Sequence, residues 1–257
     1  MTHFLGYLKD LPEEAAPECY CGDWLRRGTY TLIHSRAGVG KTAVLAELMF
    51  SLRSGQDWFG MPCPQFSGRI LYINGEMPGW QVNARLGYLK QFGFTTGIEI
   101  WHCPFHNLMD PTNMQVFIDL CASYELVIID NRSCLFQIGD ANEADSWKVL
   151  NQVLRDIPNN LGTALIMATH EGKGESTGAF GSSAQEWFAD NVIRLSKPHL
   201  SAKEQKYFDE HCGEGKYPTR MLEFTKARLS AEISPIYFTF YQPTIGRISM
   251  EWRNWIK

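Results

Sequence analysis

The sequence contains no apolar run that approaches the roughly 20 residues needed by a transmembrane helix. Its first part, Met1 to Cys21, carries acids and prolines where a secretory signal would have a cationic start and an apolar stretch. The first absence excludes a membrane-spanning helical protein, and the second argues against secretion. We therefore expect a cytoplasmic protein with no membrane partner.

An excess of positive charge is also missing. The 24 Lys and Arg residues are outnumbered by 28 Asp and Glu residues, which gives a net charge of −4. The chain therefore lacks the global cationic field that marks many nucleic-acid binders, although local basic loops stay open as contacts. A hydrophobic content of 44% with 20% charged residues excludes a disordered chain, and 257 residues suit one large α/β domain.

The cysteine spacing offers neither a disulfide framework nor a zinc knuckle. Seven cysteines are an odd number in a chain too long to need cross-links, and Cys19 and Cys21 have the wrong spacing for zinc. This usage is typical of a reducing compartment. His102, Cys103 and His106 could be taken for metal ligands, but no second ligand cluster accompanies them, so we expect no metal site there.

The chain does contain a regular alternation of β-prone and helical segments. Strands are predicted at residues 30–34, 69–74, 99–101, 126–129, 164–168, 191–195 and 220–224. Helices are predicted at residues 43–52, 80–92, 113–124 and 144–157, and the last should stop at Pro158. This alternation indicates right-handed βαβ units, and hence an α/β fold with a mostly parallel twisted sheet covered by helices.

The end of the chain has a different pattern. Residues 236–241 and 247–252 flank Pro243-Thr244-Ile245-Gly246, which predicts a C-terminal antiparallel β-hairpin. Residues 201–215 are polar and charged and are expected to form a mobile insertion.

The sequence contains no internal repeat, and it contains no linker segment whose composition would divide it into separate domains. We therefore expect an N-terminal extension over residues 1–22 and one core over residues 23–230. Residues 231–257 should form a C-terminal hairpin extension of the same domain.

A glycine-rich turn between the first predicted strand and the first predicted helix has the context that a phosphate-binding P-loop requires. Consecutive backbone N–H groups and the helix N-terminus would bind phosphate there. Lys41 would reach the β- and γ-phosphates, and Thr42 would hold Mg²⁺ through its hydroxyl. Ser35 stands where the first glycine of the motif is usual. The residues expected to bind the nucleotide are Ala37, Gly38, Val39, Gly40, Lys41 and Thr42.

Three polar residues stand at or just after the ends of predicted strands, at the edge where open α/β sheets bind ligands. Asp130 follows an apolar strand and would anchor Mg²⁺, although an Asp also commonly starts a turn. Glu76 could activate the attacking water, but many surface Glu residues occupy such turns. His170 could sense the γ-phosphate by hydrogen bonding, or could be a partly exposed imidazole without a role.

Together these motifs resemble the RecA-like P-loop ATPase core, in particular the hexameric plasmid RepA-type replicative helicases, which are single-domain relatives of DnaB-type helicases. The resemblance runs from about Asp23 to Arg228. Besides the P-loop it is carried by Trp24-Leu25, Leu71-Tyr72-Ile73-Asn74-Gly75-Glu76, Leu126 to Asp130, Thr169-His170-Glu171-Gly172-Lys173-Gly174, Gly181-Ser182-Ser183-Ala184, Ala189-Asp190-Asn191-Val192 and Lys226-Ala227-Arg228.

The resemblance implies ATP and Mg²⁺ as cofactors and a ring of identical subunits, a hexamer in that family. It implies that Glu76 is the catalytic base and that His170 couples the γ-phosphate to DNA-contacting loops. Lys226 and Arg228 would reach into the neighbouring subunit's site. Phe180 departs from the pattern, because it stands where the family commonly has an arginine.

Two functional classes remain open. The first is a helicase motor in replication, whose loops at residues 131–145 and 171–183 would contact single-stranded DNA. The side chains there that suit a single-strand groove are Arg132, Phe136, Lys173 and Phe180. The second is a non-motor ATPase switch or accessory factor, whose ATP-dependent assembly regulates a partner protein. The order of the motifs favours the motor, and the scarcity of cations favours the switch.

Overall fold

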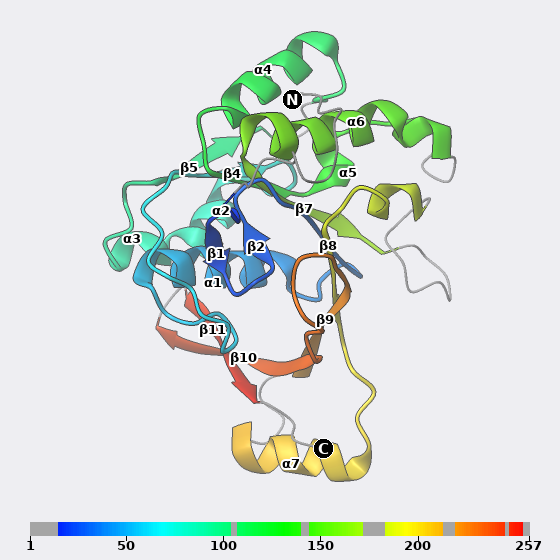
Figure 1. Ribbon diagram of the computed structural model, residues 1–257. Coiled ribbons are helices and arrows are strands. Elements are labelled where there is room, and N and C mark those ends of the chain that lie inside the picture. The colour runs from blue at the N-terminus through cyan, green and yellow to red at the C-terminus, as the bar shows by residue number, and fades with distance from the viewer. Residues whose placement is uncertain are drawn as a thin grey trace.

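The computed structural model describes residues 15–103, 107–139, 144–171, 183–212, 219–244 and 247–253. Its centre is a nine-stranded sheet with the order β11-β10-β9-β8-β3-β7-β6-β4-β5 (Figure 1). A small two-stranded sheet of β1 (Cys19–Cys21) and β2 (Leu25–Arg26), which the sequence analysis did not predict, precedes it. No helix among these residues combines the length and apolar character that crossing a membrane requires.

Six neighbouring strands of the large sheet run parallel to one another. They are β3 (Tyr30–Ser35), β4 (Ile70–Asn74), β5 (Ile98–His102), β6 (Leu126–Asp130), β7 (Ala164–His170) and β8 (Asn191–Ser196). Every residue of β3, β4 and β6 is buried, as expected for strands covered on both faces. The prediction of a mostly parallel sheet is therefore confirmed.

Three antiparallel strands extend the sheet beyond β8, namely β9 (Thr219–Ala227), β10 (Ile236–Thr244) and β11 (Arg247–Arg253). The predicted C-terminal hairpin is β10 with β11, which confirms it. Because β9 runs against β8, Ala227 at the end of β9 pairs with Asn191 at the start of β8. The last residues of β9 therefore lie at the edge where the parallel strands begin, opposite the edge where they end.

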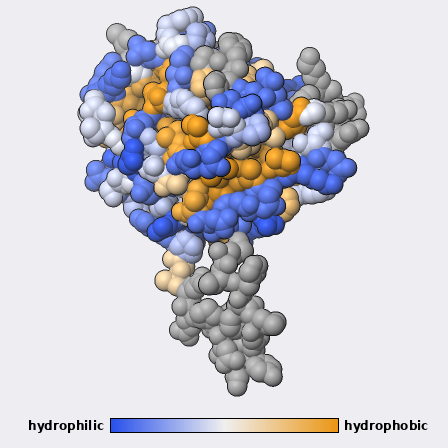
Figure 2. All heavy atoms as spheres, turned by 90° about the horizontal axis from the view of Figure 1, so that it is seen from above, coloured by the Kyte–Doolittle hydropathy of each residue, from blue (hydrophilic) through white to orange (hydrophobic). Residues whose placement is uncertain are grey.

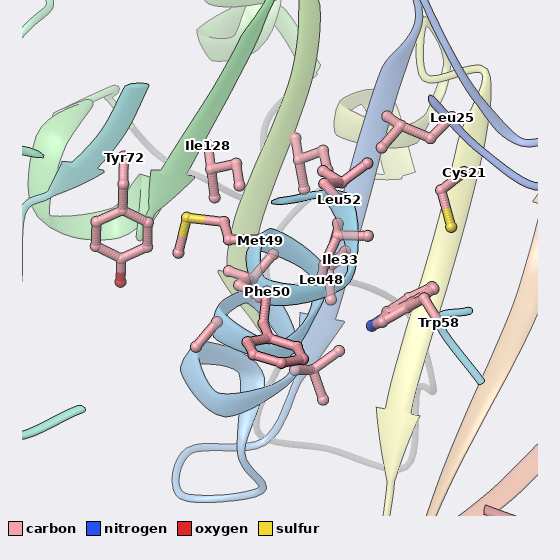
Figure 3. Packing of buried hydrophobic residues seen from close by; sticks show 14 of the residues in the cluster. Cys21, Leu25, Ile33, Leu48, Met49, Phe50, Leu52, Trp58, Tyr72 and Ile128 are labelled. Carbon is pink, nitrogen blue, oxygen red and sulfur yellow. The ribbon is translucent and has the colours of Figure 1, made fainter. Parts of the chain in front are cut away.

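Helices cover both faces of the sheet (Figure 1). On one face lie α1 (Lys41–Ser54), α2 (Gly79–Leu86) and α3 (Tyr88–Gln91), and Figure 3 shows α1 packing through Leu48 and Met49 toward Ile33 and Ile128. On the other lie α4 (Pro111–Cys121) and α6 (Lys148–Asp156). The outer surface on that second side carries an apolar strip between hydrophilic residues (Figure 2).

Alternate residues of one strand enter the two cores. Tyr72 belongs to the α1 side, whereas Leu71 and Ile73 belong to the α4 and α6 side. This period of two explains why the central strands read as continuous apolar runs. The shorter elements are α5 (Arg132–Leu135), the 3₁₀ turns η2 (Ala144–Trp147) and η4 (Ser183–Glu186), and the π turn η3 (Ile157–Leu161).

Two predicted helices end differently in the structure. The helix predicted at residues 80–92 is divided at Gly87 into α2 and α3. The helix predicted to stop at Pro158 continues through η3 and ends at Gly162, whose left-handed φ of 72° suits a helix C-terminus. Pro158 is the second residue of η3, at the point where the α-helix passes into a π turn.

The sequence analysis predicts no helix within residues 201–215, but the structure has one there. Residues 202–212 form α7 (Ala202–Cys212). The Ser201 hydroxyl accepts from the Glu204 N–H at 3.3 Å, and the Glu204 carboxylate accepts from the Ser201 N–H at 2.8 Å. This reciprocal pair is a capping box, whose Ser-x-x-Glu signature was present in the sequence.

Candidate active site

The P-loop lies between β3 and α1, and its backbone uses conformations that glycine permits. Gly38 has φ 72° and Gly40 has φ 118°, both in the left-handed region. A Cβ added at Gly38 would meet no atom of the described residues within 4 Å, so as far as these residues are concerned the space above the loop is open to a ligand. Ser35 needs no such freedom, because it is the last residue of the extended strand β3. The departure from the usual first glycine therefore leaves the loop geometry intact.

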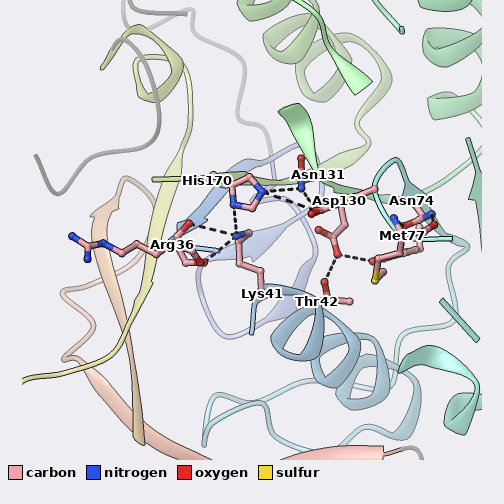
Figure 4. A network of polar contacts seen from close by, with 11 residues as sticks. Arg36, Lys41, Thr42, Asn74, Met77, Asp130, Asn131 and His170 are labelled. Atoms are coloured by element: carbon pink, nitrogen blue, oxygen red, sulfur yellow. Dashed lines mark hydrogen bonds and ion pairs between the residues drawn. The ribbon is translucent and has the colours of Figure 1, made fainter. Parts of the chain in front are cut away.

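Lys41 begins α1, and its side chain returns into the P-loop. Its ammonium lies 3.0 Å from the Ser35 hydroxyl and 3.4 Å from Nδ1 of His170 (Figure 4). Burial lowers the pKa of Lys41, and the carboxylates of Asp130 and Glu76 oppose that shift. The cation is thus held inside the loop, with acidic groups around it.

Thr42 and Asp130 meet beside this ammonium. The Thr42 hydroxyl donates to Oδ2 of Asp130 at 2.7 Å, and the Tyr72 hydroxyl donates to the same oxygen at 2.6 Å. A hydroxyl and a carboxylate are the hard oxygen donors that Mg²⁺ prefers, usually with phosphate oxygens and water completing the shell. These residues therefore fit the metal that the motif implies. Within the described ranges, no three His, Cys, Asp or Glu side chains are grouped to hold a metal ion by themselves.

Glu76, Asn131 and His170 form a second group on the same edge. The Asn131 amide donates to the Glu76 carboxylate and lies 3.2 Å from Nε2 of His170. Nε2 of His170 is 4.0 Å from the half-exposed Glu76 carboxylate. Burial, followed by the charge of Lys41, lowers the pKa of His170, so this imidazole is neutral at neutral pH.

The sheet register explains why these residues converge. Ser35 pairs with His170, and Asn74 pairs with Asp130, all at the carboxyl ends of parallel strands. Sequence reasoning missed Asn131, although it directly follows Asp130 at a strand end. Oδ1 of Asn131 is buried and has no hydrogen-bond partner among the described residues, as expected of a group that faces a ligand site.

The proposed DNA contact at Arg132 is contradicted by its position. Arg132 is only 3% exposed, and its guanidinium lies over the Trp147 ring at 4.7 Å from the centroid. A side chain covered in this way cannot present its charge to a strand outside the protein. Phe136 is also buried. Lys173 and Phe180, the other two candidates, lie outside the described residues.

Lys226 and Arg228 are not brought to the P-loop of their own chain. Lys226 donates to the carbonyl of Glu186 at 2.8 Å, and Arg228 donates to the carbonyl of Trp187 at 3.0 Å. Arg228 also lies 3.7 Å from Asp190. Lys226 is the second-last residue of β9 and Arg228 follows the end of that strand, so both cations lie at the opposite edge of the sheet from Lys41. Only a second copy could receive them at its P-loop.

A family model described as the AAA domain matches residues 9–176, which is more than half of the chain. The matched span includes the P-loop, Glu76, Asp130 and His170. The chain therefore belongs to this family of nucleotide-hydrolysing P-loop ATPases. No curated protein matches the sequence.

Proposed function

We propose that the chain hydrolyses ATP with Mg²⁺ at the edge of the sheet where Lys41, Asp130 and Glu76 converge. The observation that carries this proposal is the meeting of a P-loop with two carboxylates at the ends of neighbouring strands. One of them is buried and hydrogen-bonded to Thr42, and the other is half-exposed. The buried carboxylate suits a metal, and the exposed one can reach water.

Each residue then has a distinct role. The backbone N–H groups of residues 37–42 bind the phosphates, and Lys41 supplies the cation for the β- and γ-phosphate oxygens. Thr42 and Asp130 hold Mg²⁺, which when bound neutralises charge on those oxygens. Glu76 accepts the proton of the attacking water, and the neutral His170 hydrogen-bonds at the γ-phosphate.

The opposed positions of Lys41 and the Lys226–Arg228 pair support head-to-tail assembly. One edge of the sheet offers an ATP site, and the opposite edge offers two cations. In a head-to-tail contact, Lys226 and Arg228 of each copy would enter the ATP site of the next copy. If the rotation that relates successive copies returns to the first copy, the assembly is a closed ring. The resemblance to RepA-type helicases suggests six subunits.

Within this class we propose a helicase motor that acts on single-stranded DNA in replication. The order of the motifs supports it, and Lys173 in the 171–183 loop is its remaining candidate cation. The burial of Arg132 favours a second candidate function. This is a non-motor ATPase switch or accessory factor, whose ATP-dependent assembly regulates a partner protein.

The deciding experiment measures ATP turnover with and without single-stranded DNA and records the oligomer mass in parallel. The motor predicts that DNA stimulates turnover of an assembled form. Turnover that DNA leaves unchanged, with ATP-dependent assembly, would support the switch. Lys41→Ala serves as the background control, and turnover equal to that of the parent in this variant would refute ATP hydrolysis at this site.

A further inference from the structure

The loop that carries Glu76 is closed by the side chain of Asn74, which the hydrolysis proposed above does not use. Asn74 is the last residue of β4 and is fully buried, and it lies beside Met77 (Figure 4). Its amide nitrogen donates to the Met77 carbonyl at 2.6 Å, and its amide oxygen accepts from the Met77 N–H at 3.0 Å. One side chain thus holds both backbone polar groups of the residue that follows Glu76.

Two further contacts fix the backbone on the other side of Glu76. The Gly75 N–H donates to the Asp130 carbonyl at 2.9 Å, and a Cβ added at Gly75 would collide with Leu135. Met77 is buried, whereas the Glu76 side chain is half-exposed. Both chain neighbours of Glu76 are therefore anchored, and the direction of its carboxylate depends on how firmly they are held.

His102, on the neighbouring strand, contacts the same amide. Asn74 and His102 are paired residues of β4 and β5, and Nδ1 of His102 lies 2.8 Å from the Asn74 amide nitrogen. An amide nitrogen can only donate, so Nδ1 must accept, which requires the neutral imidazole with its proton on Nε2. Both amide hydrogens of Asn74 then have an acceptor, and the amide oxygen has a donor.

Loss of the imidazole would leave one buried N–H of Asn74 without its acceptor. Buried polar groups in native proteins are nearly always paired, because an unpaired group has lost its hydrogen bonds to water without replacement. We expect the amide to rotate toward water in that case. The rotation would release Met77 and loosen the loop that carries Glu76.

The contact with Asn74 is made from the surface of the protein. His102 is exposed, and it lines a cavity of about 300 Å³ between β5 and α2, together with Ile100 and Gly79. Gly79 is the first residue of α2, which begins just after the Glu76 loop. Because the His102 side chain lies outside the two buried cores, it can be replaced without leaving a hole in either.

We infer that His102 is a positioning residue for the proposed base Glu76 and acts through the Asn74 amide, an inference that rests on the proposed function. In the described part of the chain, the hydrogen bond of His102 is to Asn74 and not to Lys41, Thr42 or Asp130. His102 therefore affects the removal of a proton from the attacking water and leaves the affinity for Mg·ATP unchanged.

The test separates turnover from binding in His102→Leu, which removes the acceptor. We expect kcat to fall by about ten-fold, less than the ~10²-fold that a 1 Å misplacement can cost, and the Kd of Mg·ATP to stay as in the parent. His102→Asn should recover most of the parental kcat, because its amide oxygen is as many bonds from Cα as Nδ1 is. Ile100→Ala is the control on the same face of β5 and should change neither quantity.

A double variant shows whether the effect passes through Glu76. In Glu76→Gln there is no base left to position, so adding His102→Leu should not lower the residual single-turnover rate further. Parental kcat in His102→Leu would overturn the inference. So would a weakened Kd, a further ten-fold loss in the double variant, or a His102→Asn variant no more active than His102→Leu. Failure of the proposed function is distinguishable, because Glu76→Gln would then retain parental turnover.

Discussion

Thr42 and Asp130 are joined by a hydrogen bond of 2.7 Å, although 88 positions separate them in the sequence. The bond connects the first turn of α1 to the end of β6, and it places a hydroxyl and a carboxylate where a divalent cation can bind both. Tyr72 holds the same carboxylate oxygen from β4. Three neighbouring elements thus fix the geometry of the proposed Mg²⁺ site.

Lys41→Ala should abolish Mg·ATP binding. The substitution removes the cation for the β- and γ-phosphates from a site whose neighbours include the carboxylates of Asp130, Glu76 and Glu171. Equilibrium titration with a fluorescent ATP analogue measures the effect, and Lys148→Ala, on the exposed surface of α6, is the control. Binding as tight as in the parent would show that the loop is not the phosphate site.

Glu76→Gln should retain ATP binding and lose turnover by about 10²–10⁴-fold, the usual contribution of a general base. The amide occupies the same space but cannot accept the proton of water. Steady-state ATPase assays measure this loss, and Glu232→Gln at an exposed loop position should behave as the parent. Parental turnover in Glu76→Gln would transfer the role of base to another carboxylate, with Asp130 or Glu171 as the candidates.

Mixing two inactive variants should restore part of the activity if Arg228 acts in a neighbouring subunit. Lys41→Ala lacks a functional P-loop and Arg228→Ala lacks the cation, but some interfaces of a mixed assembly combine both intact groups. An arginine that a neighbouring protein inserts into the active site raises turnover by about 10³–10⁵-fold in GTPases, so the recovery of activity should be measurable. ATPase assays on mixtures shown to co-assemble are the readout. No recovery in such mixtures would place Arg228 outside the trans site.

Stability should fall on acidification because of His34. Its imidazole is buried, and burial lowers its pKa below the ordinary 6.5, with Glu171 opposing the shift in part. The unfolded chain therefore takes up a proton at a higher pH than the folded chain does. The free energy of unfolding should decrease as the pH drops from 6.5 to the lower pKa of the folded state, and this group has no effect well above 6.5. Urea unfolding at several pH values measures the slope, which should be shallower in His34→Asn. An unchanged slope in that variant would assign the effect to other groups.

The alternation of apolar strands and helices was enough to predict the parallel sheet, because burial on both faces leaves a local signature in each strand. The same logic placed Glu76, Asp130 and His170 at one edge, since parallel strands end together. The burial of Arg132 could not be predicted from the residues next to it in the sequence. Its place directly after Asp130-Asn131 predicts an accessible cation, but Trp147 from a separate segment covers it.

The helix ends show a different limit. Proline at position 158 predicts the end of a helix. In the structure it falls where α6 passes directly into a π turn, and no sequence pattern predicts that turn. By contrast, the Ser-x-x-Glu pattern of Ser201 and Glu204 is present in the sequence and predicts a helix start, but the sequence analysis considered only the polar composition around it.

The P-loop is held in part by strands that lie far beyond the family match. Nε of Arg220 on β9 donates to the Val39 carbonyl at 2.8 Å, and a side chain at Gly40 would collide with the ring of Phe240 on β10. A fragment that ends with the matched span at residue 176 would lose both supports, together with β8 beside β3. A unit that keeps both contacts therefore extends to at least residue 240, about a quarter of the chain beyond the end of the matched span.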